Sequence, residues 1–191
     1  MKKVLLLVVA AVSVLCAGVA YAYEFSTDVV TTARSERFSG KMYVSDGKVR
    51  MESPQAVTIT NTEKKLVWVL MPSQNMYMEQ PMNFQSVAGA TEKAPGEIER
   101  TLIGPDTVNG RPVKKYRVRC STPQGETEMF QWMDAGINMP VKTAAVDGSW
   151  STEFRNLAVG PQAPGLFELP AGYKKFAMPN MNDIMNAMKE Q

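Results

Sequence analysis

The sequence contains no histidine and only two cysteines among its 191 residues. Nucleophilic sites that need an imidazole base are therefore excluded, as are zinc and iron sites that use histidine ligands. Cys16 falls in the N-terminal apolar segment, so Cys120 has no partner for an intrachain disulfide once that segment is removed. Strand alternation places Cys120 beside Tyr116 and Val118, which predicts a buried small hydrophobe rather than a reactive thiol.

Net charge is also nearly absent. Two of the 21 basic residues lie in the predicted signal peptide, which leaves 21 − 2 = 19 basic residues against 19 acidic ones. The one basic stretch, 114–119, has the pattern of a solvated strand face. Neither nucleic acid nor an anionic membrane surface is therefore expected as a partner. The acidic residues are scattered without a spaced carboxylate pair of the glycosidase type, so the sequence does not indicate an enzyme.

The first 22 residues predict a cleaved secretory signal peptide. Two lysines precede an apolar run over 4–19, and Ala20-Tyr21-Ala22 presents small residues at the two positions that a signal peptidase reads. A lipoprotein carrying its lipid on Cys16 is the alternative, which the bulky Leu15 in front of that cysteine disfavours. We therefore expect a periplasmic, lipid-free mature protein that begins at Tyr23 and has 191 − 22 = 169 residues.

The mature chain reads as one mostly β domain over 23–179, followed by an amphipathic tail over 180–191 that is predicted to form a short helix. Turn residues separate about ten predicted strands. These are 24–32, 37–44, 48–52, a segment around 57–59, then 66–71, 76–79, 98–103, 113–122, 127–134, 139–146 and 150–159. Residues 81–96 break the pattern and predict a lid or binding loop, with a helical turn near 84–88. Hairpin turns and scarce helix favour a single antiparallel sheet that curls, closes or stacks.

One predicted strand, 66–71, does not alternate between apolar and polar residues. Leu66, Trp68 and Leu70 occupy one face, and the other face is also apolar. An antiparallel strand of this kind is covered on both faces. The central strand of a sandwich satisfies this requirement, and so does a curved sheet that lines a ligand site. The mature chain also has 14 − 1 = 13 methionines, whose flexible thioethers suit surfaces that accept apolar partners of variable shape.

Three stretches carry a resemblance to a known family: FSGKMYVSDGKVRMES, VTITNTEKKLVWVLMP with the Met-rich strand after it, and LFELPAGYKKF. In this order they resemble the LolA/LolB superfamily of periplasmic lipoprotein carriers, and most closely a small uncharacterised bacterial branch with the same predicted fold. The resemblance covers nearly the whole mature chain. It implies an unclosed antiparallel half-barrel whose concave side holds acyl chains beneath a lid.

The leading functional hypothesis is a non-enzymatic, monomeric periplasmic protein that binds an acyl chain, a lipid or a lipoprotein anchor, without a cofactor or a metal site. The predicted ligand-binding residues are Met42, Trp68, Leu70, Met76, Met78, Phe130, Trp132, Trp150 and Phe154. One alternative is a structural or sensor module that binds an envelope protein through the same concave face. Another is Cu(I) binding by thioethers. The methionines considered for that alternative are Met76, Met78, Met178, Met181, Met185 and Met188.

Overall fold

The computed structural model describes residues 24–34, 36–82, 93–123 and 125–176. The predicted signal peptide, the helical turn near 84–88 and the predicted tail over 180–191 lie outside these ranges. In the described part of the chain, no helix is both long and apolar enough to cross a bilayer.

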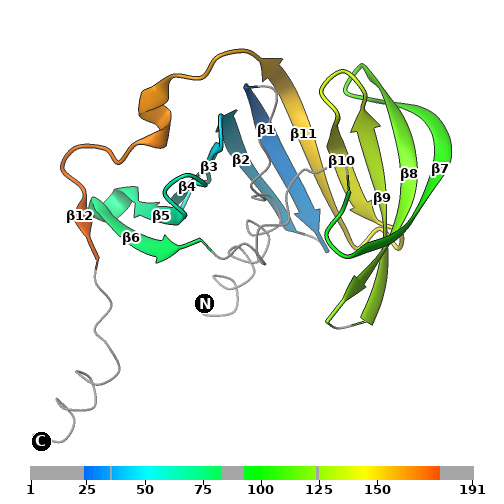
Figure 1. The fold of residues 1–191 in the computed structure, drawn as a ribbon, viewed down its shortest axis with the longest axis horizontal. Helices are drawn as coiled ribbons and strands as arrows, with labels where there is room; N and C mark the ends of the chain where they lie inside the picture. The colour runs from blue at the N-terminus through cyan, green and yellow to red at the C-terminus, as the bar shows by residue number, and fades with distance from the viewer. Residues whose placement is uncertain (1–23, 35, 83–92, 124, 177–191) are drawn as a thin grey trace, which may run out of the picture.

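A single open sheet dominates the described residues (Figure 1). Its strands are β1 (Phe25–Ala33), β2 (Glu36–Ser45), β3 (Lys48–Glu52), β4 (Val57–Asn61), β5 (Leu66–Met71), β6 (Met76–Pro81), β7 (Glu97–Val108), β8 (Arg111–Thr122), β9 (Gly125–Asp134), β10 (Met139–Ala145), β11 (Trp150–Val159) and β12 (Lys174–Lys175). Their order across the sheet is β12-β6-β5-β4-β3-β2-β1-β11-β10-β9-β8-β7. Two short 3-10 turns, η1 (Pro72–Gln74) and η3 (Pro164–Phe167), accompany them.

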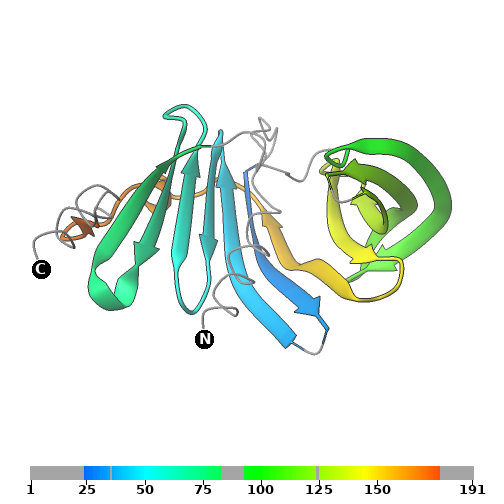
Figure 2. The same cartoon turned by 90° about the horizontal axis from the view of Figure 1, so that it is seen from below.

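The sheet is curved and unclosed, as expected for a half-barrel. Figure 2 shows β1 to β6 as a fanned array and the other end, β7 to β10, rolled up tightly. Neighbouring strands pair antiparallel throughout, except that β12 runs parallel to β6. The sequence-based prediction of a mostly β, single-sheet fold is therefore confirmed.

Hairpin turns form where the sequence predicts them. Asn109 and Gly110 join β7 to β8 with φ values of 51° and 77°, and Asp46 and Gly47 join β2 to β3 with φ values of 24° and 68°. Asparagine, aspartate and glycine tolerate this left-handed region, which the tight turns of twisted hairpins require. These dipeptides therefore fix the register of the strands that follow.

Strand β7 is longer than predicted. The expected strand ended at residue 103, before Gly104 and Pro105, but β7 continues to Val108. Its pairing with β8 is irregular at two places, between Glu97 and Glu99 and between Leu102 and Gly104. β7 is the last strand of the sheet, and edge strands tolerate proline because one of their sides needs no ladder partner.

Most buried apolar side chains of the described residues gather in two large clusters. The first joins β1, β2 and β3 to the rolled end of the sheet. The second lies between β4, β5 and the segment that leads from β11 to β12. That segment, residues 160–176, is called the strap below. Figure 1 shows it in orange, leaving β11 and passing over to the edge of β6.

Candidate functional site

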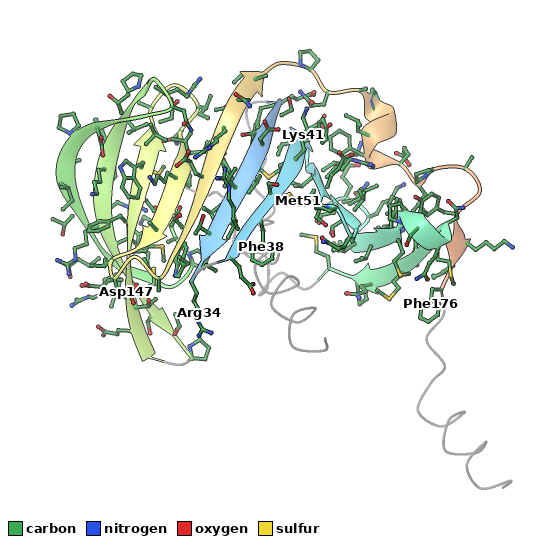
Figure 3. The ribbon with its side chains drawn as sticks, turned by 180° about the vertical axis from the view of Figure 1, so that it is seen from behind. Arg34, Phe38, Lys41, Met51, Asp147 and Phe176 are labelled. Atoms are coloured by element: carbon green, nitrogen blue, oxygen red, sulfur yellow. The ribbon has the colours of Figure 1, made fainter. Side chains whose placement is uncertain are left out.

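One face of the sheet is built by cross-strand neighbours that run from β1 to β6. Directly opposite residues of antiparallel strands share a face. The first row of such neighbours is Thr27, Met42, Met51, Thr58, Val69 and Met78, and the second is Phe25, Val44, Val49, Thr60, Val67 and Gln80. Met71 lies opposite Met76 on the same face. We call this surface the methionine face; Figure 3 labels Met51 and Phe38, two of its residues.

The opposite face of the same strands is covered by the strap. Phe167, 1% exposed, packs in one cluster with Val57, Ile59, Trp68 and Leu70. Arg50 fixes the strap further, because its Nη1 donates to the Leu166 carbonyl oxygen at 2.9 Å. The apolar character of both β5 faces follows from this arrangement. One face lies beneath the strap, and the other forms part of the methionine face.

Charged groups on the strap side hold β6 to β12. Glu79 accepts a hydrogen bond from Trp68 Nε1 at 3.0 Å and forms an ion pair with Lys175 Nζ at 2.7 Å. The hydrogen bonds from Lys175 and Trp68 hold the pKa of the Glu79 carboxyl below its ordinary value. Backbone bonds from Lys174 N to Asn75 O and from Phe176 N to Tyr77 O complete the pairing.

The methionine face, in contrast, is almost free of charge. Within β1 to β6 its one charged side chain is Glu36, the first residue of β2. The other face of the same strands carries Lys41, Arg50, Glu52 and Glu79. The two faces therefore differ sharply in polarity although both are rich in apolar residues.

Burial changes along the methionine face. Met42 and Val44 are 0% exposed and Met51 is 7% exposed, and all three belong to the first buried cluster. Toward β6 the side chains are only half-buried. This half-buried set comprises Val67, Val69, Met71, Met76 and Met78. Among the described residues, none of these five joins one of the buried apolar clusters. An apolar surface of this kind is suited to cover a ligand or a partner.

The face continues into the rolled end of the sheet and becomes polar there. Thr31, Thr152, Thr143 and Gln131 are successive cross-strand neighbours. Thr31 and Thr152 share a hydrogen bond of 3.0 Å between their hydroxyl oxygens. Beyond them, Gln131 accepts a hydrogen bond of 2.9 Å from Arg100 Nη2.

A largely buried ion pair stabilises this polar end. The Glu97 side chain, 8% exposed, accepts bonds from Arg100 Nε at 2.8 Å and Nη2 at 2.7 Å, and from the Ala94 N–H at 2.7 Å. Burial alone would raise the pKa of Glu97, but these hydrogen bonds hold it below its ordinary value. Nearby, Cys120 is 1% exposed, and burial, followed by the charge of Glu97, raises the pKa of its thiol. The prediction of a buried cysteine is confirmed.

We expect Glu97→Gln to lower the free energy of unfolding by about 1–3 kcal/mol at neutral pH, because charge-assisted hydrogen bonds are lost. The folded-state pKa of Glu97 is depressed. Its contribution is thus complete above the unfolded pKa of about 4.3 and is lost as pH falls through the folded pKa. Urea unfolding at pH 7 and pH 3 measures this effect, and the difference in free energy of unfolding between wild type and variant should be smaller at pH 3.

The matched control is Glu99→Gln on the same strand. The Glu99 side chain is 54% exposed and its partner Arg119 is 43% exposed. An exposed pair of this kind contributes only about 0–1 kcal/mol. If the difference in free energy of unfolding between wild type and Glu97→Gln is the same at both pH values, the ionised Glu97 carboxylate is not what stabilises this end of the sheet.

The structure divides the nine predicted ligand-binding residues among different surfaces. Met42, Met76 and Met78 lie on the methionine face. Trp150 lies opposite Ala33 and Phe154 lies opposite Val29, so both share this face. Trp68 and Leu70 lie on the other face, beneath the strap.

Phe130 and Trp132 lie in the rolled end, where Trp132 belongs to the first buried cluster together with Met42 and Phe154, and Phe130 packs against that cluster. Lys115 Nζ lies 4.2 Å from the Phe130 ring centroid and 4.8 Å from that of Trp132. Trp132 Nε1 donates to Asp106 Oδ2 at 2.7 Å, and this bond, with one from the Thr107 N–H, lowers the pKa of Asp106. Trp132 therefore ties β9 to β7.

Sequence reasoning omitted the residues of the methionine face that β5 contributes. Val67, Val69 and Met71 alternate with the predicted Trp68 and Leu70. The signal for them was present, because both sets are apolar. Only the position of the strap decides which set is covered by the chain itself.

Solved structures with a similar fold are known. The crystal structure of MucB superimposes with a TM-score of 0.52 and 15% sequence identity, over 86% of this chain and 62% of that one. The complex of MucA and MucB from Pseudomonas aeruginosa gives a TM-score of 0.50 at 16% identity, over 80% of this chain and 57% of the other. The chain shares its fold with MucB. It spans about six tenths of the length of that protein.

Comparison by sequence adds nothing to this result. No family model matches the chain. No curated protein matches it either. The expected architecture, an open and curved antiparallel sheet, is confirmed.

Proposed function

We propose that this protein is a non-enzymatic periplasmic binding protein that holds an acyl chain, from a lipid or a lipoprotein anchor, on the methionine face. The observation that carries the proposal is the contrast between the two faces of β5. The strap covers one face from within the chain, while the other bears five half-buried apolar side chains that join no buried cluster of the described residues.

The chemistry of the face supports an acyl ligand. Burial of each methylene contributes about 0.8 kcal/mol, so a long chain is held without a charged clamp. A face with a single charged residue at its end offers no ionic partner that would have to be desolvated. Methionine side chains adapt to chains of different length and bend.

The test is native mass spectrometry of the purified protein combined with lipid extraction and titration with a fluorescent fatty acid. We expect co-purifying acyl material or saturable binding of the probe at one site. Trp150, half-buried on the methionine face, should change its emission when the probe binds. A protein that carries no lipid and ignores the probe would overturn the proposal.

A second candidate function is recognition of an envelope protein through the same face. It is favoured by one comparison, because a crystal structure shows MucB in complex with MucA. The two candidates predict different outcomes, since an acyl-binding face takes up a free fatty acid, whereas a face that recognises a protein binds a partner segment that carries no acyl group.

A further inference from the structure

The hairpin of β5 and β6 brings three methionines together at the half-buried end of the methionine face. Met71 lies directly opposite Met76, and Met78 is two residues farther along β6, so it shares their face. The turn between the strands is compact: η1 begins at a proline, and Asn75 closes it with a φ of 50°. All three methionines are half-buried, unlike Met42 and Met139, which are 0% and 2% exposed.

The register places these thioethers within reach of a single ion. Directly opposite residues have Cβ atoms about 5 Å apart, and residues i and i+2 of one strand are about 7 Å apart. A methionine side chain has three rotatable bonds, so three such arms on one face are able to converge above the sheet. The hairpin fixes the Cβ positions of the three methionines, and their flexible side chains allow the sulfur atoms to move toward one ion.

The donor set selects the ion. Thioether sulfur is soft and uncharged and prefers Cu(I) to hard divalent ions. Three neutral donors on a face almost free of charge offset little of the charge of Cu(II) or Zn(II), whose burial would be more costly than that of a monovalent ion. We propose that Met71, Met76 and Met78 form a Cu(I)-binding site. The site binds the ion without electron transfer.

This inference does not rest on the proposed acyl function. It goes beyond the thioether hypothesis drawn from the sequence, which grouped Met76 with Met78 but lacked the third donor, Met71. Cross-strand pairing supplies that donor, and a trigonal set of sulfur ligands is complete with it.

The experiment is anaerobic titration of the purified protein with Cu(I) against a chromophoric chelator, with native mass spectrometry for stoichiometry and X-ray absorption for the ligands. We expect one ion per chain and a first shell of sulfur alone. Met71→Leu, Met76→Leu and Met78→Leu should each weaken binding at least tenfold. The control is Met129→Leu, a half-buried methionine on β9, which should leave the affinity unchanged.

Leucine replaces methionine with little change in volume, so the variants should keep the fold while losing the metal. Far-ultraviolet circular dichroism and the urea midpoint check the fold. The inference is overturned by absent Cu(I) binding, by equally tight Zn(II) binding, or by Cu(I) binding that survives the triple leucine variant. If the wild-type protein binds Cu(I) but does not bind the acyl probe, only the proposed acyl-binding function is refuted.

Discussion

Replacing Phe167 with alanine should lower the free energy of unfolding by about 3–5 kcal/mol, the usual cost of removing a fully buried phenylalanine. Phe167 is 1% exposed and is the strap residue that belongs to the second buried cluster. Its loss leaves a cavity above Ile59 and Trp68, which are 0% and 6% exposed. Urea unfolding followed by tryptophan emission measures the change.

The strap itself provides the control. Phe176 is 39% exposed, so Phe176→Ala should change the free energy of unfolding by no more than about 0.5 kcal/mol, as surface substitutions do. The same side chain is thereby removed from two positions of one segment. Similar losses for both variants, or a loss below about 1 kcal/mol for Phe167→Ala, would show that the strap does not close the core.

The reason that this large effect was not foreseen is physical. Leu166, Phe167 and Leu169 follow neither the two-residue period of a strand nor the period of a helix. Their partners lie about a hundred residues earlier in β4 and β5, and nothing local in the sequence encodes that contact. Local alternation could therefore predict β5 and its two apolar faces, but not which of them the chain covers.

Hairpins were predictable because their signals are local. Asn109-Gly110 and Asp46-Gly47 specify positive φ, and the register of each following strand depends on that turn. The bulge between Leu102 and Gly104 has no comparable signature, so the second half of β7 was missed. A one-residue irregularity reassigns every later side chain to the other face, which limits any prediction of a site from alternation alone.

The same limit applied to the candidate site. Trp68 and Leu70 were grouped with Met78 because all are large and apolar, yet Met78 lies opposite Val69 rather than Trp68. The pairing partner decides the face, and pairing partners are known only once the register is fixed. The methionine face thus emerged from the cross-strand rows and not from residue type.

Val69→Glu should weaken binding of the fluorescent fatty acid about a hundredfold or more. Val69 lies in the middle of the methionine face, between Thr58 and Met78. A carboxylate there is half-exposed in the free protein but is covered when the acyl chain binds. Covering an unpaired charge costs several kcal/mol, and each 1.4 kcal/mol corresponds to about a tenfold loss of affinity.

Two further variants separate the effect of the face from the effects of charge and of fold. Gln74→Glu adds the same charge in the exposed turn of the same hairpin and should bind the probe like wild type. Val69→Ile keeps the position apolar and should also bind, with the urea midpoint reporting that each variant is folded. If a folded Val69→Glu variant binds the probe with wild-type affinity, the methionine face is not the binding surface, because a ligand on that face must cover the new carboxylate. Equal weakening by Gln74→Glu would instead trace the loss to net charge, a result that a ligand held by apolar contacts alone does not allow.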